Sequence, residues 1–150
     1  MIHETLKFTR TIAADPARVY HCMTDASARQ VWNSPDADAV FTVQNPQPAT
    51  AGARETGTVG PADNPYVTAQ TDWIITDPGA QLVYAETLEA DGMALATALA
   101  CAVFESADGK TDLTLHVHIT SFTGEDTIAE VRGGWEFAFD AMANFAAAGV

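Results

Sequence analysis

Two Asp-Gly dipeptides, Asp91-Gly92 and Asp108-Gly109, constrain the fold of this chain more than any other feature of its sequence. Each dipeptide stands between two extended runs of residues, and this arrangement is the strongest short-range signal for a β-hairpin. A third turn is indicated by Pro78 and Gly79 in "TDPGAQ". The segment from Asp72 through "LTLHVHIT" is therefore predicted to form four successive strands of an antiparallel meander.

The Asp108-Gly109 turn also predicts which residues of the last two strands face each other. A two-residue turn fixes the register of a hairpin, and successive side chains then alternate between the two faces of the sheet. The predicted pairs are Phe104–Leu113, Ala102–Leu115 and Ala100–Val117 on one face, with Cys101–His116 and Leu99–His118 on the other.

The loop before Met93 is compatible with two registers. A three-residue "ADG" loop with a glycine bulge at Gly92, which we favour, puts Leu82, Tyr84, Glu86 and Leu88 on the face that carries Phe104. A two-residue turn would instead flip that strand. In the favoured register a row of small side chains shares this face and leaves space for a helix or a ligand: Ala94, Ala96, Ala98, Ala100 and Ala102.

The N-terminal part is predicted to form one strand and two short helices. Polar and apolar residues alternate over Glu4–Ile12, which indicates a strand. The pair Asp15-Pro16 has the N-cap and first-turn chemistry of a helix start. A second short helix is capped by Thr24 or Asp25 and ends near Trp32. Proline and glycine clusters then separate short strands between residues 40 and 71.

The C-terminal segment predicts one long amphipathic helix. Thr127 and Glu130 have the spacing of a capping box. Gly133 and Gly134 fall in its early turns, although each glycine costs about 0.5–1 kcal/mol relative to alanine. They either let the helix approach the sheet or bend over a cavity, or they mark a local kink. The apolar stripe consists of Ile128, Val131, Trp135, Ala138, Phe139, Met142, Phe145 and Ala146.

These elements predict an α+β fold in which a curved antiparallel sheet of six or seven strands wraps around the C-terminal helix. The length of 150 residues suits one domain over residues 1–150. The net charge of −13 disfavours nucleic acid and membrane partners. The start "MIHETLKFTR" lacks the apolar region of a secretory signal, so we expect a cytoplasmic protein.

Several motifs, in this order, resemble the START-like helix-grip (SRPBCC) superfamily, and within it the group related to the C-terminal domain of the heat-shock protein 90 ATPase activator. The motifs are "FTRTIAADPARVYHCMTDASARQVW", "TDWIITDPGAQLVYAET", "ALACAVFESADGKTDLTLHV" and "GGWEFAFDAMANF". The resemblance implies a helix-grip fold with a hydrophobic cavity between the sheet and the final helix. The superfamily hosts ligand binders, cyclases, dehydratases, oxygenase domains and chaperone regulators, so the function stays open.

We expect this cavity to bind a small hydrophobic or aromatic molecule, without a cofactor. Tyrosine hydroxyl and tryptophan N–H groups can orient such a ligand at an otherwise apolar wall. The residues expected to line the cavity are Trp32, Tyr66, Trp73, Tyr84, Glu86, Phe104, Leu115, Val117, Trp135, Phe139 and Met142.

Glu86 and Tyr84 are the candidate catalytic residues. In the favoured register Glu86 points inward, where apolar surroundings raise the pKa of a carboxyl group towards the range of a general acid or base. Otherwise Glu86 lies in water at the end of the sheet. Arg54 is a candidate partner for it. An enzyme of the cyclase or hydratase kind is therefore the alternative to a binding protein, with Tyr66 as a further acid–base group. The resemblance adds chaperone ATPase regulation as a third alternative.

His116 and His118 share one strand face, a spacing that can hold a metal ion if two further ligands converge. The predicted register turns them away from the helix, so we expect no metal site. Cys22 and Cys101 lack the spacing of a redox or metal motif, and we expect reduced thiols. Leu99, Cys101 and Val103 make this outer face apolar enough for a homodimer contact.

Overall fold

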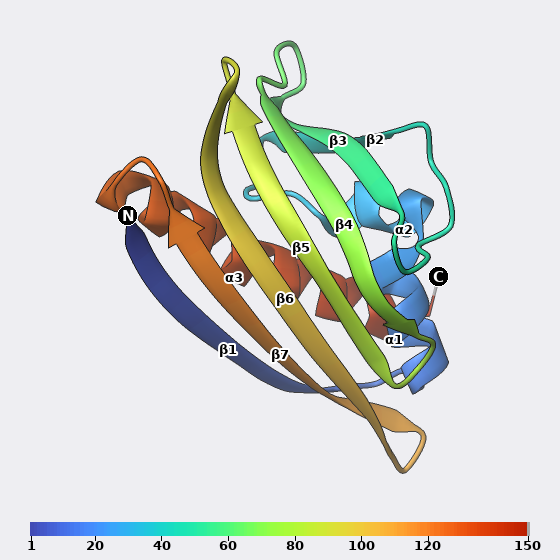
Figure 1. Ribbon diagram of the computed structural model, residues 1–150. Helices are drawn as coiled ribbons and strands as arrows, with labels where there is room; N and C mark the ends of the chain where they lie inside the picture. Colours follow the sequence, from blue (N-terminus) through green and yellow to red (C-terminus); the bar gives the residue numbers. More distant parts are fainter. Residues whose placement is uncertain (150) are drawn as a thin grey trace.

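The computed structural model describes residues 1–149 and contains one seven-stranded antiparallel sheet and three helices (Figure 1). Val150, the last residue of the expected domain, lies outside the described residues. The strands lie in the order β1-β7-β6-β5-β4-β3-β2. Their bounds are Ile2–Ile12 (β1), Ala39–Gln44 (β2), Arg54–Pro61 (β3), Val67–Asp77 (β4), Gln81–Ala90 (β5), Met93–Ala107 (β6) and Lys110–Ser121 (β7). The helices are Pro16–Thr24 (α1), Ala26–Trp32 (α2) and Glu125–Ala147 (α3).

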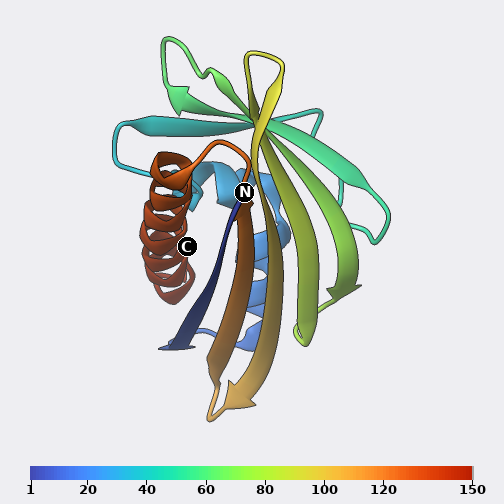
Figure 2. The ribbon, with the colours of Figure 1, turned by 60° about the vertical axis from the view of Figure 1, so that its left-hand side comes forward.

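The sheet curves around α3, which confirms the predicted α+β helix-grip architecture (Figure 2). The long helix packs mainly on β1, β7 and β6, and it also contacts α1 and α2. The other half of the concave face, formed by β5, β4, β3 and β2, is therefore less covered by α3. This asymmetry determines where a cavity can form.

The two short helices begin where the sequence predicts. Asp15 accepts a hydrogen bond from the backbone N–H of Arg18 (2.8 Å), and Asp25 accepts one from that of Ala28 (2.9 Å). Side-chain caps of this kind satisfy N–H groups that have no partner inside the helix. Of the two alternatives for the second cap, Asp25 rather than Thr24 is the one that the structure uses.

The predicted capping box of α3 is wrong. The helix begins at Glu125, with Gly124 as its N-cap at a φ of 100°, and no side chain caps it. Thr127 lies inside the first turn, and its hydroxyl shares a hydrogen bond of 2.6 Å with that of Thr123. Because Gly124 adopts a backbone conformation that favours glycine, the helix starts earlier than the spacing of Thr127 and Glu130 indicates.

The structure confirms the register of β6 and β7 at all five predicted pairs. In the preceding hairpin the predicted face is correct, but the predicted bulge is not. Asp91-Gly92 forms a two-residue turn with Ala90 opposite Met93, and an extra residue on β6, Leu95, shifts the register before Leu88 pairs with Ala96. The bulge restores the expected face for Glu86, while Ala94 is exposed and does not belong to the alanine row.

The four remaining alanines of the row are buried in the hydrophobic core rather than at an empty space. They are Ala96, Ala98, Ala100 and Ala102, each at most 4% exposed. The core around them includes Leu115 and Val117 of β7 and Val131, Ala138 and Met142 of α3. Of the two alternatives given above, a packed helix and not a ligand fills the space over this row.

Candidate functional site

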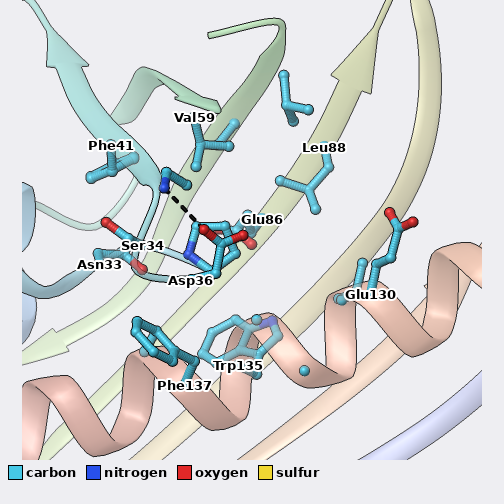
Figure 3. Close-up of a pocket in the computed structure, with 18 of the residues that line it drawn as sticks. Asn33, Ser34, Asp36, Phe41, Val59, Glu86, Leu88, Glu130, Trp135 and Phe137 are labelled. Carbon is cyan, nitrogen blue, oxygen red and sulfur yellow. Dashed lines mark hydrogen bonds between the residues drawn. The ribbon is translucent and has the colours of Figure 1, made fainter. Parts of the chain in front are cut away.

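A cavity of about 820 Å³ lies between α3, the loop 33–38 and the half of the sheet that α3 leaves less covered. This volume falls within the range of about 300–1,000 Å³ that is usual for small-molecule sites. Figure 3 shows Trp135 and Phe137 of α3 on one side of the cavity, with Phe41, Val59 and Leu88 on the sheet side. Most of the walls are apolar side chains.

Eight of the residues expected from the sequence line this cavity: Trp32, Tyr66, Tyr84, Glu86, Leu115, Trp135, Phe139 and Met142. Tyr84 stacks on Trp135, with 6.3 Å between ring centroids and an interplanar angle of 27°. The indole N–H of Trp32 donates to the backbone carbonyl of Cys22 (2.8 Å). That N–H therefore holds α2 against α1 instead of facing a ligand.

The structure places the other three expected residues in the core and not at the cavity wall. Trp73 is 3% exposed and lies behind Tyr84, with 5.2 Å between their ring centroids. Phe104 is 5% exposed and packs edge-on against Tyr20 of α1. Val117 is fully buried. Each of these three residues lies on the predicted, inner face of the sheet, but neighbouring side chains separate it from the cavity.

Glu86 is half-buried and forms part of the cavity wall on β5. Burial raises the pKa of its carboxyl group to about 7, against the opposing effect of the Arg29 charge. No other described residue donates a hydrogen bond to this carboxyl group. Burial also raises the pKa of Tyr84, and the neighbouring charge of Glu86 raises it further. The cavity thus contains a carboxyl group whose pKa is raised towards neutral pH by burial.

A buried ion pair that the sequence reasoning missed lies next to Glu86. Arg29 of α2 and Glu55 of β3 are 4% and 8% exposed, and two hydrogen bonds of 2.8 and 2.7 Å join them side by side. Glu55 pairs with Thr71 on β4, and Thr71 pairs with Glu86 on β5. One feature of the sequence could have indicated that Arg29 faces inward. Arg29 precedes Trp32 by three residues, so the two share a helix face.

The expected partnership between Arg54 and Glu86 is wrong. Arg54 binds Asp72 on the adjacent strand β4, with 2.7 Å between its Nε and the carboxylate, and 62% of its side chain is exposed. Glu55, the next residue on β3, points to the opposite face, where it reaches Arg29. The alternation of side chains along β3 therefore sends Arg54 away from the cavity.

The rim of the cavity combines exposed aromatic rings with acidic side chains. Tyr66 is 61% exposed and Phe137 is 43% exposed. Asp36 comes from the loop after α2, and Glu130 comes from α3 (Figure 3). Asp38 comes from the same loop as Asp36. The Asp36 carboxylate accepts hydrogen bonds from the backbone N–H groups of Asp38 and Ala39 (2.9 and 3.0 Å), which fixes this loop.

Gly133 and Gly134 both line the cavity, but they do not bring α3 close to the sheet. A Cβ atom on Gly134 would lie 3.2 Å from Cβ of Pro35, whereas one on Gly133 would have no neighbour within 4 Å. The close approach is therefore made by Gly134 to the loop 33–38. This corrects the expectation of a helix-to-sheet contact and leaves Gly133 without a packing role.

His116 and His118 lie on the outer, convex face, as the register predicts, with 6.4 Å between their ring centroids. Within residues 1–149 no group of three or more histidine, cysteine, aspartate or glutamate side chains could hold a metal ion. Leu99 and Val103 on this face are 38% and 41% exposed. Over the same residues, no helix is long and apolar enough to cross a membrane.

Comparisons with known proteins agree on the family and on the fold. A family model described as "Activator of Hsp90 ATPase homolog 1-like protein" matches residues 13–147. No curated protein sequence matches the chain. Protein CV1439 from Chromobacterium violaceum superposes with a TM-score of 0.81 at 17% identity, over 95% of this chain and 96% of that chain. A protein from Rhizobium leguminosarum superposes with a TM-score of 0.78 at 21% identity, over 97% of this chain and 95% of that chain.

Proposed function

Because the chain belongs to the activator of Hsp90 ATPase homolog 1-like family, whose fold commonly serves to bind hydrophobic ligands, we propose that it binds a small hydrophobic or aromatic molecule. The observation that carries this proposal is the cavity of about 820 Å³ beside α3, with its largely apolar walls. Removing apolar surface from water supplies about 25 cal/mol per Å², so an apolar ligand that fills such a space gains affinity from burial alone.

The wall of the cavity favours a flat ligand. Trp135 and Tyr84 both line the cavity and stack on each other, and a flat ring of a ligand can stack in turn on aromatic side chains of this kind. Glu86 adds one polar group without a partner among the described side chains, and such a group can fix the orientation of a bound molecule.

Binding can be tested with N-phenyl-1-naphthylamine, a neutral probe that fluoresces in apolar surroundings. We expect Leu88→Trp to weaken probe binding about tenfold or more, because Leu88 lines the cavity and an indole there would occupy its space. Thr87→Trp is the matched control, since Thr87 is the adjacent residue on β5 and points to the other face. Equal affinity in both variants would contradict binding in this cavity. Native mass spectrometry of protein purified from its own host would then identify the natural ligand.

A second candidate function is acid–base catalysis on the bound molecule, of the cyclase or hydratase kind. The pKa of about 7 for Glu86 favours it, because a carboxyl group that titrates near neutral pH can both accept and donate a proton. Tyr84 lies on the same strand face and would contribute a hydroxyl group. The test is to incubate the ligand found by mass spectrometry with the protein and with Glu86→Gln. A product whose formation depends on Glu86 would support catalysis. An unchanged ligand would contradict catalysis and support binding alone.

A further inference from the structure

The charged side chains that line the cavity are mostly acidic. Among residues 1–149 they comprise four carboxylic acids and one guanidinium group. Glu86 lies in the wall, whereas Asp36, Asp38 and Glu130 are exposed at the rim. The guanidinium group belongs to Arg29. An anion that enters this cavity therefore approaches a region of negative charge.

Arg29 does not offset this charge for a ligand, because its own charge is already paired with that of Glu55. Its two terminal nitrogens donate to the two carboxylate oxygens of Glu55. The rings of Phe41 and Trp73 lie 5.5 and 5.2 Å from its central carbon, so aromatic side chains also cover the guanidinium group. A ligand carboxylate that took the place of Glu55 on the two terminal nitrogens would leave a buried charge unpaired, which is strongly unfavourable.

Glu86, in contrast, has unused capacity to accept hydrogen bonds. The charged and titratable groups that act on it are Arg29 from α2, Glu55 from β3 and Tyr84 from its own strand, and Arg29 and Glu55 neutralise each other. A protonated amine would form a charge-assisted hydrogen bond with the Glu86 carboxylate. The Trp135 ring, on the α3 side of the same cavity, offers a face that attracts cations.

From this arrangement we propose that the cavity selects hydrophobic molecules that carry a protonated amine, and rejects those that carry a carboxylate or a phosphate. The inference rests on the proposed ligand-binding function and specifies the chemical class of the ligand. Glu86 is the residue that determines the selectivity, and the acidic rim adds long-range attraction for a cation.

Three probes of nearly equal shape test this inference by isothermal titration calorimetry: 2-naphthylmethylamine, 2-naphthylmethanol and 2-naphthoate. At about pH 8 we expect the amine to bind about tenfold more tightly than the alcohol, and 2-naphthoate to bind most weakly. Glu86→Gln should remove the advantage of the amine. Glu136→Gln is the matched control, because Glu136 is exposed on α3 and does not line the cavity.

The wild-type protein supplies a second measurement that needs no variant. Between about pH 8 and pH 6 the advantage of the amine should shrink, since Glu86 takes up a proton and loses its charge. If the alcohol binds as tightly as the amine, or if 2-naphthoate binds most tightly, the proposed selectivity for amines is wrong. The proposed ligand-binding function would then still be supported. Failure of all three probes to bind would overturn both proposals.

Discussion

Arg29 donates two parallel hydrogen bonds to Glu55, from Nη1 to Oε1 at 2.8 Å and from Nη2 to Oε2 at 2.7 Å. The pair joins the short helix α2 to β3, next to the cavity wall that carries Glu86. Both side chains are almost completely withdrawn from water. Burial makes each charge dependent on the other, because removal of one partner leaves the second without solvent or a counterion.

We predict that Arg29→Met lowers the free energy of unfolding by about 3–5 kcal/mol, because it leaves Glu55 as an unpaired buried charge. The double variant Arg29→Met/Glu55→Leu should recover most of this loss, since it replaces both charges with apolar side chains. Urea unfolding of the two variants and of Glu55→Leu completes a double-mutant cycle.

The exposed pair of Arg54 and Asp72 provides the matched control, since it also joins an arginine to a carboxylate through two hydrogen bonds. Arg54→Met should cost less than about 1 kcal/mol, because solvent screens an exposed ion pair. Equal costs for Arg29→Met and Arg54→Met would show that burial does not govern the strength of the inner pair.

The register of β6 and β7 was predictable because the hairpin that sets it is short. Asp108 and Gly109 both adopt positive φ values, 52° and 76°, as a two-residue turn of this kind requires. Such a turn leaves no freedom in the pairing that follows, so the faces of Phe104 and Leu115 follow from it. The bulge at Leu95 had no such local signal, and the sequence pointed to Gly92 in its place.

The ion pair and the loop wall of the cavity could not be predicted in this way. Arg29 and Glu55 are 26 residues apart, on elements whose relative position depends on how α2 docks on the sheet. Gln30 contributes to that docking by accepting a hydrogen bond from the backbone N–H of Val43 on β2 (2.8 Å). Long-range packing of this kind leaves no periodic pattern in the sequence, and a charged residue on a short helix is usually exposed.

We predict that Glu86→Gln changes how stability depends on pH. Burial raises the pKa of Glu86 from 4.5 to about 7, so the folded protein retains a proton that the unfolded chain releases between these values. This stabilising effect is complete below pH 4.5 and is lost as the pH rises through 7. Relative to Glu86→Gln, the wild-type protein should therefore lose about 1–2 kcal/mol of stability between about pH 5.5 and 8.5. Urea unfolding of both proteins across this pH range measures the difference. If the free energies of unfolding of the two proteins change in parallel with pH, the pKa of Glu86 is not raised.

The adjacent glycines of α3 should respond differently to alanine. Gly133→Ala should raise the free energy of unfolding by about 0.5–1 kcal/mol, because its Cβ meets nothing within 4 Å and alanine favours the helix. Gly134→Ala should not raise the free energy of unfolding, since its Cβ would press on Pro35 at 3.2 Å. Gly134→Leu should be destabilising. Thermal unfolding compares the three variants, and a stabilised Gly134→Leu protein would disprove the role of the contact with Pro35.

A third glycine, Gly57 on β3, lies beneath the ring of Phe41, and we predict that Gly57→Ala reshapes the cavity. The new Cβ would lie 2.7 Å from Cε1 of Phe41 and 3.1 Å from the carbonyl oxygen of Thr42, so the ring must move. Overpacking of this kind costs about 1–3 kcal/mol. Because Phe41 lines the cavity and covers Arg29, affinity for N-phenyl-1-naphthylamine should change as well. Urea unfolding in a Phe41→Leu background gives the check: the smaller side chain should reduce the cost of Gly57→Ala, and an equal cost in both backgrounds would exclude the ring as its cause.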